Sequence, residues 1–255
     1  NLTAGQAGAL TSTQLAAMST EVVASLTAAQ IAALNAKAVS GMAAAQIGAL
    51  SAGQVEAFTI AQIGALTATQ VAEFGTAAIA TFSPAEIAAI TPAALAGMPP
   101  ERFAGLEPDQ FVALTTAQVS GLKPGQVAAM TSEQRDALTT AQIGALGPTQ
   151  IAVLGTDVIA GSSTDQIAAL STRAVAGLTV DQFSALSISQ VDTLSAAQIG
   201  ALTAAHIGAI GTAALETFAA ADIAAIGATA ISGLSTANVA PLSLEQVGAL
   251  TTPQV

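Results

Sequence analysis

The residues that could do chemistry in this 255-residue chain are few and scattered. There is one histidine, His206, and no cysteine, while Ser and Thr are plentiful. Nucleophilic or acid–base catalysis needs such groups placed beside one another. No G-x-S-x-G, H-E-x-x-H, P-loop or G-x-G-x-x-G motif occurs in the context that its chemistry requires. The sequence therefore predicts no enzyme, no catalytic residues and no bound cofactor.

Three carboxylates have a spacing that could suit a metal ion. Asp157, Asp165 and Asp181 are 8 or 16 residues apart, so they could line one face and attract Ca²⁺. However, no D-x-D-x-D-G loop or glycine–aspartate nonapeptide is present. Carboxylates that complement the positive end of a helix dipole are the favoured interpretation, and we predict no metal site.

The elements that position these side chains come from an eight-residue motif, here called an octad. With Thr139 as position 1 and Leu146 as position 8, the register runs through the chain without insertion or deletion. Position 8 is Leu, Met, Phe or Ile everywhere except Ser162, and position 5 is Ile, Val, Leu or Phe except Ala7 and Arg135. Position 4 is Gln 19 times, and position 1 is Ser, Thr or Asn in 22 of 32 octads. Such a strict period is the mark of a repeat array.

Each octad carries the signals that start a helix. In Thr139–Gln142 the pattern S/T-x-x-Q is a capping box, and Leu138 with Ile143 forms a hydrophobic staple around it. The next two features are shared by several octads. Proline stands at position 2, where the first helical residue is expected, at Pro84, Pro92, Pro100, Pro108, Pro124 and Pro148. Acidic residues collect at position 3, as at Asp109, Glu133, Asp165, Asp181 and Glu245.

The pattern therefore predicts an all-α solenoid of about 32 units, each a helix of roughly six residues followed by a sharp corner. Positions 5 and 8 should be buried against neighbouring units, and the small residue at position 7 should permit close approach. One continuous helix is disfavoured, because 800° per octad would spiral the apolar stripe around the rod. A β-solenoid with 16-residue coils is the alternative, although Ala, Gln and Gly are poor strand formers.

Exceptions to the motif recur with a longer period. The non-Gln residues at position 4 between Val22 and Arg102 are matched 136 residues later, and only His206 breaks this pairing. Residues 1–255 thus form a single array with a second-order repeat, about 3–138 and 139–255, the latter incomplete, and with no separate globular domain. A block duplication and a geometric cause both explain the period. His206 is expected to be an exposed variant, and Arg135 and Ser162 to reflect drift, a solvated face or a partner contact.

Composition narrows the partners. The chain is 52% hydrophobic and 8% charged, with 5 Lys+Arg against 16 Asp+Glu, a net charge of −11. This balance argues against nucleic acid, whose phosphates require cations, and against anionic membrane surfaces. Mean hydropathy is +0.65, yet Thr, Ser or Gln interrupts almost every octad, so we expect no transmembrane segment. With no initiator Met and no signal-like segment, the sequence looks like a piece or a processed form of something longer.

The motif T-x-x-Q-[IV]-x-A-L resembles octapeptide arrays of very large proteobacterial surface proteins, described as adhesin-like or haem-utilisation/adhesion proteins. The resemblance covers essentially the whole chain and implies an extracellular or cell-surface location. We therefore expect a non-enzymatic structural scaffold, either an adhesin stalk or the subunit of a self-assembling filament, tube or sheath. The alternative is a solenoid binding module for a surface protein or glycan. Self-association is also expected, because an uncapped solenoid end exposes apolar residues.

Overall fold

The computed structural model describes residues 2–255, and in this part of the chain every regular element is helical, with no strand. The all-α prediction is therefore confirmed, and the β-solenoid alternative is wrong. The chain divides into two units, Asn1–Leu138 and Thr139–Val255. This boundary coincides with the start of the second copy of the 136-residue repeat.

Each unit is a succession of helices of four to six residues, one for each octad, apart from two 3₁₀ turns near the C-terminus. The helices of the first unit are α1 (Ala4–Gly8), α2 (Ser12–Ala16), α3 (Thr20–Ala24), α4 (Ala28–Ala33), α5 (Ala36–Val39), α6 (Ala44–Gly48), α7 (Ala52–Glu56), α8 (Ile60–Ile63), α9 (Ala68–Val71), α10 (Thr76–Ile79), α11 (Pro84–Ala89), α12 (Pro92–Leu95), α13 (Pro100–Phe103), α14 (Pro108–Val112), α15 (Thr116–Gly121), α16 (Pro124–Ala128) and α17 (Ser132–Asp136). The second unit contains α18 (Thr140–Gly144), α19 (Pro148–Ile151), α20 (Thr156–Gly161), α21 (Thr164–Ala168), α22 (Thr172–Ala176), α23 (Val180–Ser184), α24 (Ile188–Asp192), α25 (Ala196–Ile199), α26 (Ala204–Ala209), α27 (Thr212–Thr217), α28 (Ala220–Ala225), η1 (Ile231–Gly233), α29 (Thr236–Val239), α30 (Leu244–Gly248) and η2 (Thr252–Gln254).

The predicted helix starts are present. At α15 the Thr115 side chain accepts a hydrogen bond from the backbone N–H of Gln118, and the Gln118 side chain accepts one from the backbone of Thr115. Proline occupies the first turn of α11, α12, α13, α14, α16 and α19, as predicted from position 2. Because these signals are local, each octad can begin its own helix whatever its neighbours do.

Every helix ends at a corner made by positions 8 and 1. At the end of α11, for example, Ile90 has φ −61° and ψ 129°, and Thr91 has φ −63° and ψ 148°. Two extended residues in succession turn the chain before the next cap. Among the described residues no backbone has a positive φ, so these corners need no left-handed residue.

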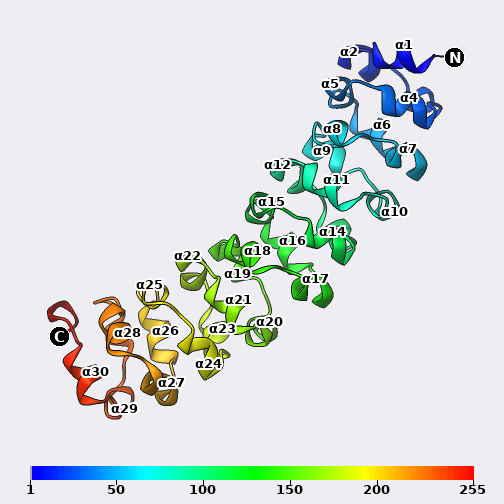
Figure 1. The fold of residues 1–255 in the computed structure, drawn as a ribbon. Coiled ribbons are helices and arrows are strands. Elements are labelled where there is room, and N and C mark those ends of the chain that lie inside the picture. Colours follow the sequence, from blue (N-terminus) through cyan, green and yellow to red (C-terminus); the bar gives the residue numbers. More distant parts are fainter. Residues whose placement is uncertain (1) are drawn as a thin grey trace. The chain divides into compact units, whose positions relative to one another are not determined.

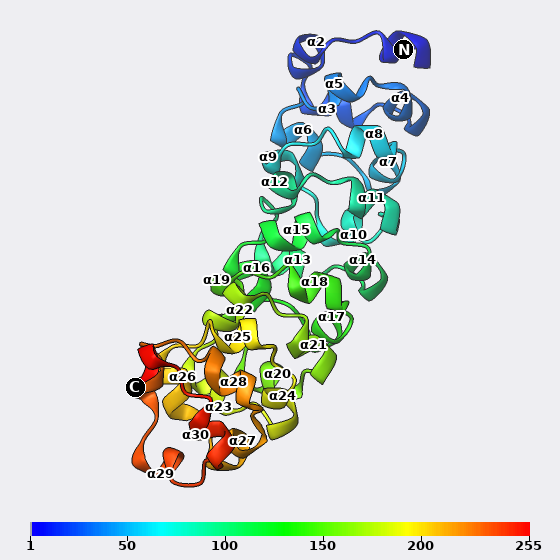
Figure 2. The same cartoon turned by 60° about the vertical axis from the view of Figure 1, so that its left-hand side comes forward.

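The helices stack at an interval of three octads. In the first unit α11 packs against α8 and α14, and α12 packs against α9 and α15. In the second unit α23 packs against α20 and α26 in the same way. One coil of the solenoid therefore takes three octads of eight residues, or 24 residues. Figures 1 and 2 show this winding from two directions, with each short helix lying beside the one three places earlier.

The core of each unit is a narrow apolar column supplied by positions 5 and 8. Val119 and Val175, both at position 5, are fully buried, and Leu122 and Leu178 at position 8 are each 4% exposed. Burial of the two apolar positions is confirmed. Helices this short are unstable alone, so their stability comes from this stacking.

Two further observations bear on the array. The stacking interval of three octads does not divide the seventeen-octad repeat, which favours duplication over a geometric origin for the longer period. Among residues 2–255 no helix combines the length and the apolar character needed to cross a lipid bilayer.

Candidate functional site

The most organised polar feature of the molecule is the position-4 side chain, which joins two coils. Its oxygen caps its own helix: Gln126 Oε1 accepts from the Lys123 N–H at 2.9 Å, and Gln46 Oε1 accepts from the Ala43 N–H at 2.8 Å. Neither Lys123 nor Ala43 offers a hydroxyl. The glutamine half of the capping box therefore persists in octads where position 1 departs from Ser or Thr.

The nitrogen of the same amide binds the coil before. Gln118 Nε2 donates to Ile87 O at 2.7 Å and to Ile90 O at 2.6 Å, which are 31 and 28 residues earlier. These acceptors are positions 5 and 8 of the octad four places back. At least one bond of this register is made by Gln30, Gln46, Gln54, Gln62, Gln70, Gln110, Gln126, Gln134, Gln182, Gln190, Gln198, Gln246 and Gln254.

Glutamine suits this position because it is both an acceptor and a double donor. The first N–H groups and the last C=O groups of a helix have no partner inside it, and these octads are nearly all ends. One buried amide supplies an acceptor to the first kind of group and donors to the second. Among the described residues no buried side-chain nitrogen or oxygen lacks a hydrogen-bond partner. The sequence predicted the cap but missed the contact between coils.

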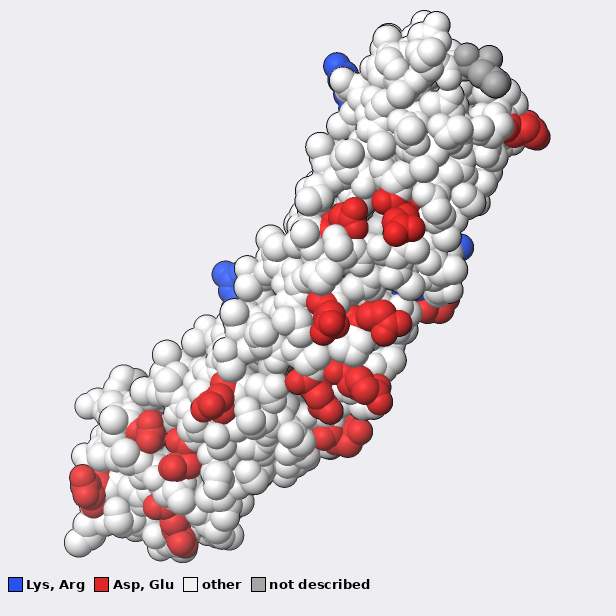
Figure 3. All heavy atoms as spheres, turned by 45° about the vertical axis from the view of Figure 1, so that its right-hand side comes forward, with Lys and Arg blue, Asp and Glu red and all other residues white. Residues whose placement is uncertain are grey.

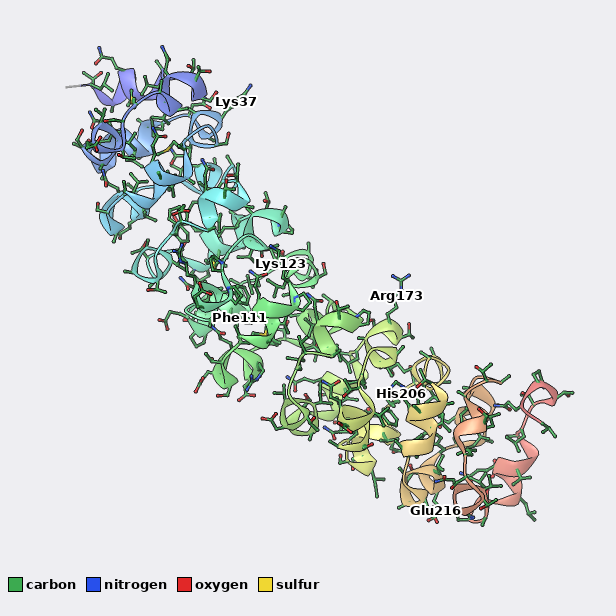
Figure 4. The ribbon with its side chains drawn as sticks, turned by 180° about the vertical axis from the view of Figure 1, so that it is seen from behind. Lys37, Phe111, Lys123, Arg173, His206 and Glu216 are labelled. Atoms are coloured by element: carbon green, nitrogen blue, oxygen red, sulfur yellow. The ribbon has the colours of Figure 1, made fainter. Side chains whose placement is uncertain are left out.

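The prediction that His206 is an exposed variant is wrong. His206 is 3% exposed and occupies the place of the glutamine. Its Nδ1 accepts from the Thr203 N–H at 3.3 Å, and its Nε2 lies 2.8 Å from Leu178 O, so the neutral ring with the proton on Nε2 reproduces both glutamine contacts. The ring packs against Phe183 with centroids 5.2 Å apart. Figure 4 shows His206 within the coil and Arg173 projecting from it.

Octads with alanine at position 4 form a second class. They often carry glycine at position 7, as in Ala94 with Gly97 and Ala174 with Gly177. A Cβ added to Gly97 would lie 2.6 Å from the Cβ of Ala68, three octads earlier. The helix without an amide therefore approaches its neighbour more closely, and the predicted close approach at position 7 is confirmed at these glycines.

Other side chains at position 4 replace the amide only in part. The Arg102 guanidinium donates to Ala72 O, and Asn238 Nδ2 donates to Ile210 O at 3.1 Å. Glu86 keeps the cap, because its Oε2 accepts from the Ser83 N–H at 2.7 Å, but an ionised carboxylate cannot donate to a carbonyl. Octad 83–90 thus lacks the polar bond to the coil before it.

The three aspartates considered as a calcium site lie where helices begin. Asp157, Asp165 and Asp181 fall in the first turns of α20, α21 and α23. Of these helices, α20 and α23 stack on each other, whereas α21 stacks on α18 and α24. Within residues 2–255 no group of three His, Asp or Glu side chains could hold a metal ion. The dipole-complementing interpretation is consistent with these positions.

Carboxylates gather on the stacked helices α11, α14 and α17 of the first unit. These helices and their caps carry Glu86, Glu107, Asp109, Glu133 and Asp136, and α11 packs on α14 as α14 packs on α17. Acidic side chains are prominent on the face shown in Figure 3. We refer to these five residues as the acidic column.

Two position-3 glutamates show how such carboxylates are held. The pKa of Glu133 is lowered chiefly because the carboxylate accepts from its own backbone N–H, and then because of the Thr131 hydroxyl. The pKa of Glu21 is lowered in the same way, by its own backbone N–H and by Ser19. Both effects favour the charged form at the start of a helix.

The two residues that break the apolar pattern are both half-buried. The Arg135 guanidinium donates to Met130 O at 3.0 Å, and the Ser162 hydroxyl donates to Val158 O at 2.9 Å. The Ser162 carbonyl also accepts from Gln190 Nε2 at 2.7 Å. Each therefore satisfies its polar group on nearby backbone, and neither is brought together with other reactive side chains.

A family model described as the ALTTAQ repeat matches residues 103–140 and 212–252. The six letters of that name stand at 113–118 and 137–142, where they are positions 7, 8, 1, 2, 3 and 4 of consecutive octads. The matches support the class of protein that the fold defines, a helical repeat protein. No curated protein matches the chain.

Proposed function

We propose that this chain is a non-enzymatic structural scaffold, part of an adhesin stalk or of a filament, tube or sheath at the cell surface or outside the cell. One observation carries the proposal: the polar groups that this sequence repeats are used to hold coils together. Position 1 caps the helix, and position 4 joins it to the preceding coil. A surface built this way offers regular backbone spacing in place of a reaction centre.

The resemblance of the octad to those of large proteobacterial adhesin-like proteins supports the location. Immunolabelling of intact cells of the source organism tests it, and we expect surface signal that protease treatment of whole cells removes. Signal confined to the cytosolic fraction would overturn the location while leaving the scaffold role untouched.

Tolerance of length is the experimental mark of a scaffold. Removing residues 99–122, which are three complete octads, should leave the helical content per residue and the cooperativity of urea unfolding unchanged, because each coil contacts only its neighbours. Removing residues 99–110 takes out one and a half octads and shifts every position-4 amide away from its carbonyls. That matched deletion should lose much of its helical signal. Equal behaviour of the two deletions would count against the scaffold.

The alternative is a binding module for a surface protein or glycan, and the acidic column is the feature that favours it. Such a module requires a saturable ligand whose affinity falls with salt. We would test basic peptides and anionic and neutral glycans against wild type and against Glu107→Gln/Asp109→Asn. Saturable binding lost in the double variant would establish the module; an absence of binding in both would favour the scaffold.

A further inference from the structure

The first octads of the chain display the contact that interior octads bury. In the interior, Gln62 and Gln118 are each 1% exposed because the octad four places earlier covers them. Gln6 and Gln14 hold the same position and are exposed, with their oxygens still capping Thr3 and Thr11. Val22, the next residue of this series, is 46% exposed. Amide donors and an apolar group therefore lie ready on this face, here called the leading face.

A hollow accompanies these residues. A cavity of about 590 Å³ is lined by Leu2, Val22, Leu26 and Gln30, with small residues around them. Leu26 is 6% exposed, so the hollow has an apolar floor with the Gln30 amide at its side. Its shape and chemistry suit an apolar octad with free carbonyls.

The last octads display the complementary half. Val239 and Val247, at position 5, are 43% and 44% exposed, whereas Val119 and Val175 at the same position are fully buried. Positions 5 and 8 are those whose carbonyls accept from glutamine everywhere else in the array. The exposed apolar side chains and their carbonyls form what is here called the trailing face.

The octad register pairs the two faces residue by residue. If a second copy follows the first as the next coil, the interval of four octads sets Gln6 against Ile231 and Leu234, and Gln14 against Val239 and Leu242. The same interval brings Val22, an apolar residue where glutamine is the rule, onto Val247 and Leu250. The donors thus meet carbonyls, and the exposed valine meets an exposed valine.

Resting on the scaffold function proposed above, we infer that copies of this chain associate head to tail, with the trailing face of one copy covering the leading face of the next. The occupant of the leading face is a second copy of the chain. Such an interface is heterologous, since each copy uses a different surface on each side, and it extends into a linear assembly.

The test blocks each face separately. The leading-face variant Gln14→Glu/Val22→Glu keeps an acceptor for the Thr11 cap but loses the amide donor and the apolar contact. The trailing-face variant Val239→Glu/Val247→Glu charges the other side. Light scattering after size exclusion should show concentration-dependent oligomers for wild type and monomers for each variant alone. Far-UV circular dichroism checks that both remain helical.

Mixing the two variants gives the decisive result. Each retains one intact face, so an equimolar mixture should form dimers and nothing larger. A matched control, Gly5→Glu/Thr13→Glu, adds the same charge at exposed position 3, which lies away from both faces, and it should assemble like wild type. Monomeric wild type at every concentration, or assembly of either blocked variant alone, would overturn the inference.

A cysteine pair reports the same contact independently, because the chain has no cysteine. Position 2 of one octad lies against position 7 three octads later, as Ser12 lies against Gly41. Across the proposed interface this pair is Thr236 and Ala9. Chains with Thr236→Cys and Ala9→Cys should form a disulfide heterodimer when mixed, and Ala160→Cys, on an exposed helix side, should not replace either. Failure here with normal tolerance of the 24-residue deletion would reject stacking and spare the scaffold.

Discussion

The two roles of the position-4 amide can be separated by one substitution made at two places. Gln126 is fully buried; its oxygen caps Lys123, and its nitrogen donates to Leu95 O at 2.9 Å and to Met98 O at 3.0 Å. Gln126→Glu keeps the cap, as Glu86 does at its own octad, but removes both donors and sets a carboxylate against two carbonyl oxygens. Gln14→Glu makes the same change where the amide is exposed.

The magnitude follows from what each variant leaves unpaired. Two carbonyls lose a donor at about 1 kcal/mol each, and the buried carboxylate adds about 1 kcal/mol or more, so Gln126→Glu should lose ~3 kcal/mol of unfolding free energy at neutral pH. Gln14→Glu should stay within ~0.5 kcal/mol, since an exposed site has nothing to leave unpaired. Urea unfolding followed by circular dichroism, at concentrations where the protein is monomeric, measures both.

The introduced carboxylate also predicts a pH dependence. In the folded Gln126→Glu variant, burial against carbonyl oxygens raises the pKa of the introduced carboxyl group above its unfolded value of about 4.3. Protonation restores one donor, so the deficit should be smallest below that pH and should grow as pH rises through the folded pKa. Equal losses for Gln126→Glu and Gln14→Glu, or a deficit independent of pH, would refute the reasoning.

Three further substitutions test other contacts by urea unfolding. Gly97→Ala should cost about 1–2 kcal/mol because its Cβ meets Ala68, whereas Gly53→Ala, in α7 with no atom within 4 Å of the added Cβ, should gain ~0.5–1 kcal/mol; the same sign for both would contradict the close approach. Glu86→Gln should stabilise the chain by about 1–2 kcal/mol by adding donors for two carbonyls of the preceding coil, and no gain would contradict the inter-coil bond. Because the pKa of Glu133 is lowered, its carboxylate stabilises the fold above the unfolded pKa and that contribution is lost as pH falls through the folded pKa, so Glu133→Gln should reduce the acid sensitivity between about pH 6 and pH 3, while an unchanged profile would contradict it.

Local signals explain how much of the fold was predictable. A capping residue such as Thr115 and a first-turn proline such as Pro92 act within their own octad, so the helix starts could be placed from sequence. The burial of positions 5 and 8 also follows from the pattern, because a six-residue helix has no other use for two large apolar groups.

The number of octads in a coil could not be predicted. Every octad has the same apolar positions, so the motif does not say whether a helix packs on its second, third or fourth predecessor. That choice depends on the angle at the corner between positions 8 and 1, where Ile90 and Thr91 take extended φ and ψ. Small differences in these angles accumulate over a coil, and no residue type at the corner fixes them.

The same gap led to the error at His206. Exposure of position 4 depends on a partner 28 to 31 residues earlier, and without the coil length that partner is unknown. With the coil length given, the pairing of alanine at position 4 with glycine at position 7, as in Ala94 and Gly97, would have indicated where helices approach most closely.

Exchange of the glutamine side-chain amide protons with solvent tests the central claim most directly, because the fold depends on these amides binding the coil before. Nuclear magnetic resonance of the assigned NH₂ groups should show slow exchange for Gln62 and Gln118 and fast exchange for Gln6 and Gln14 at monomeric concentrations. Fast exchange at all four, in a chain that is folded and helical, would contradict the account.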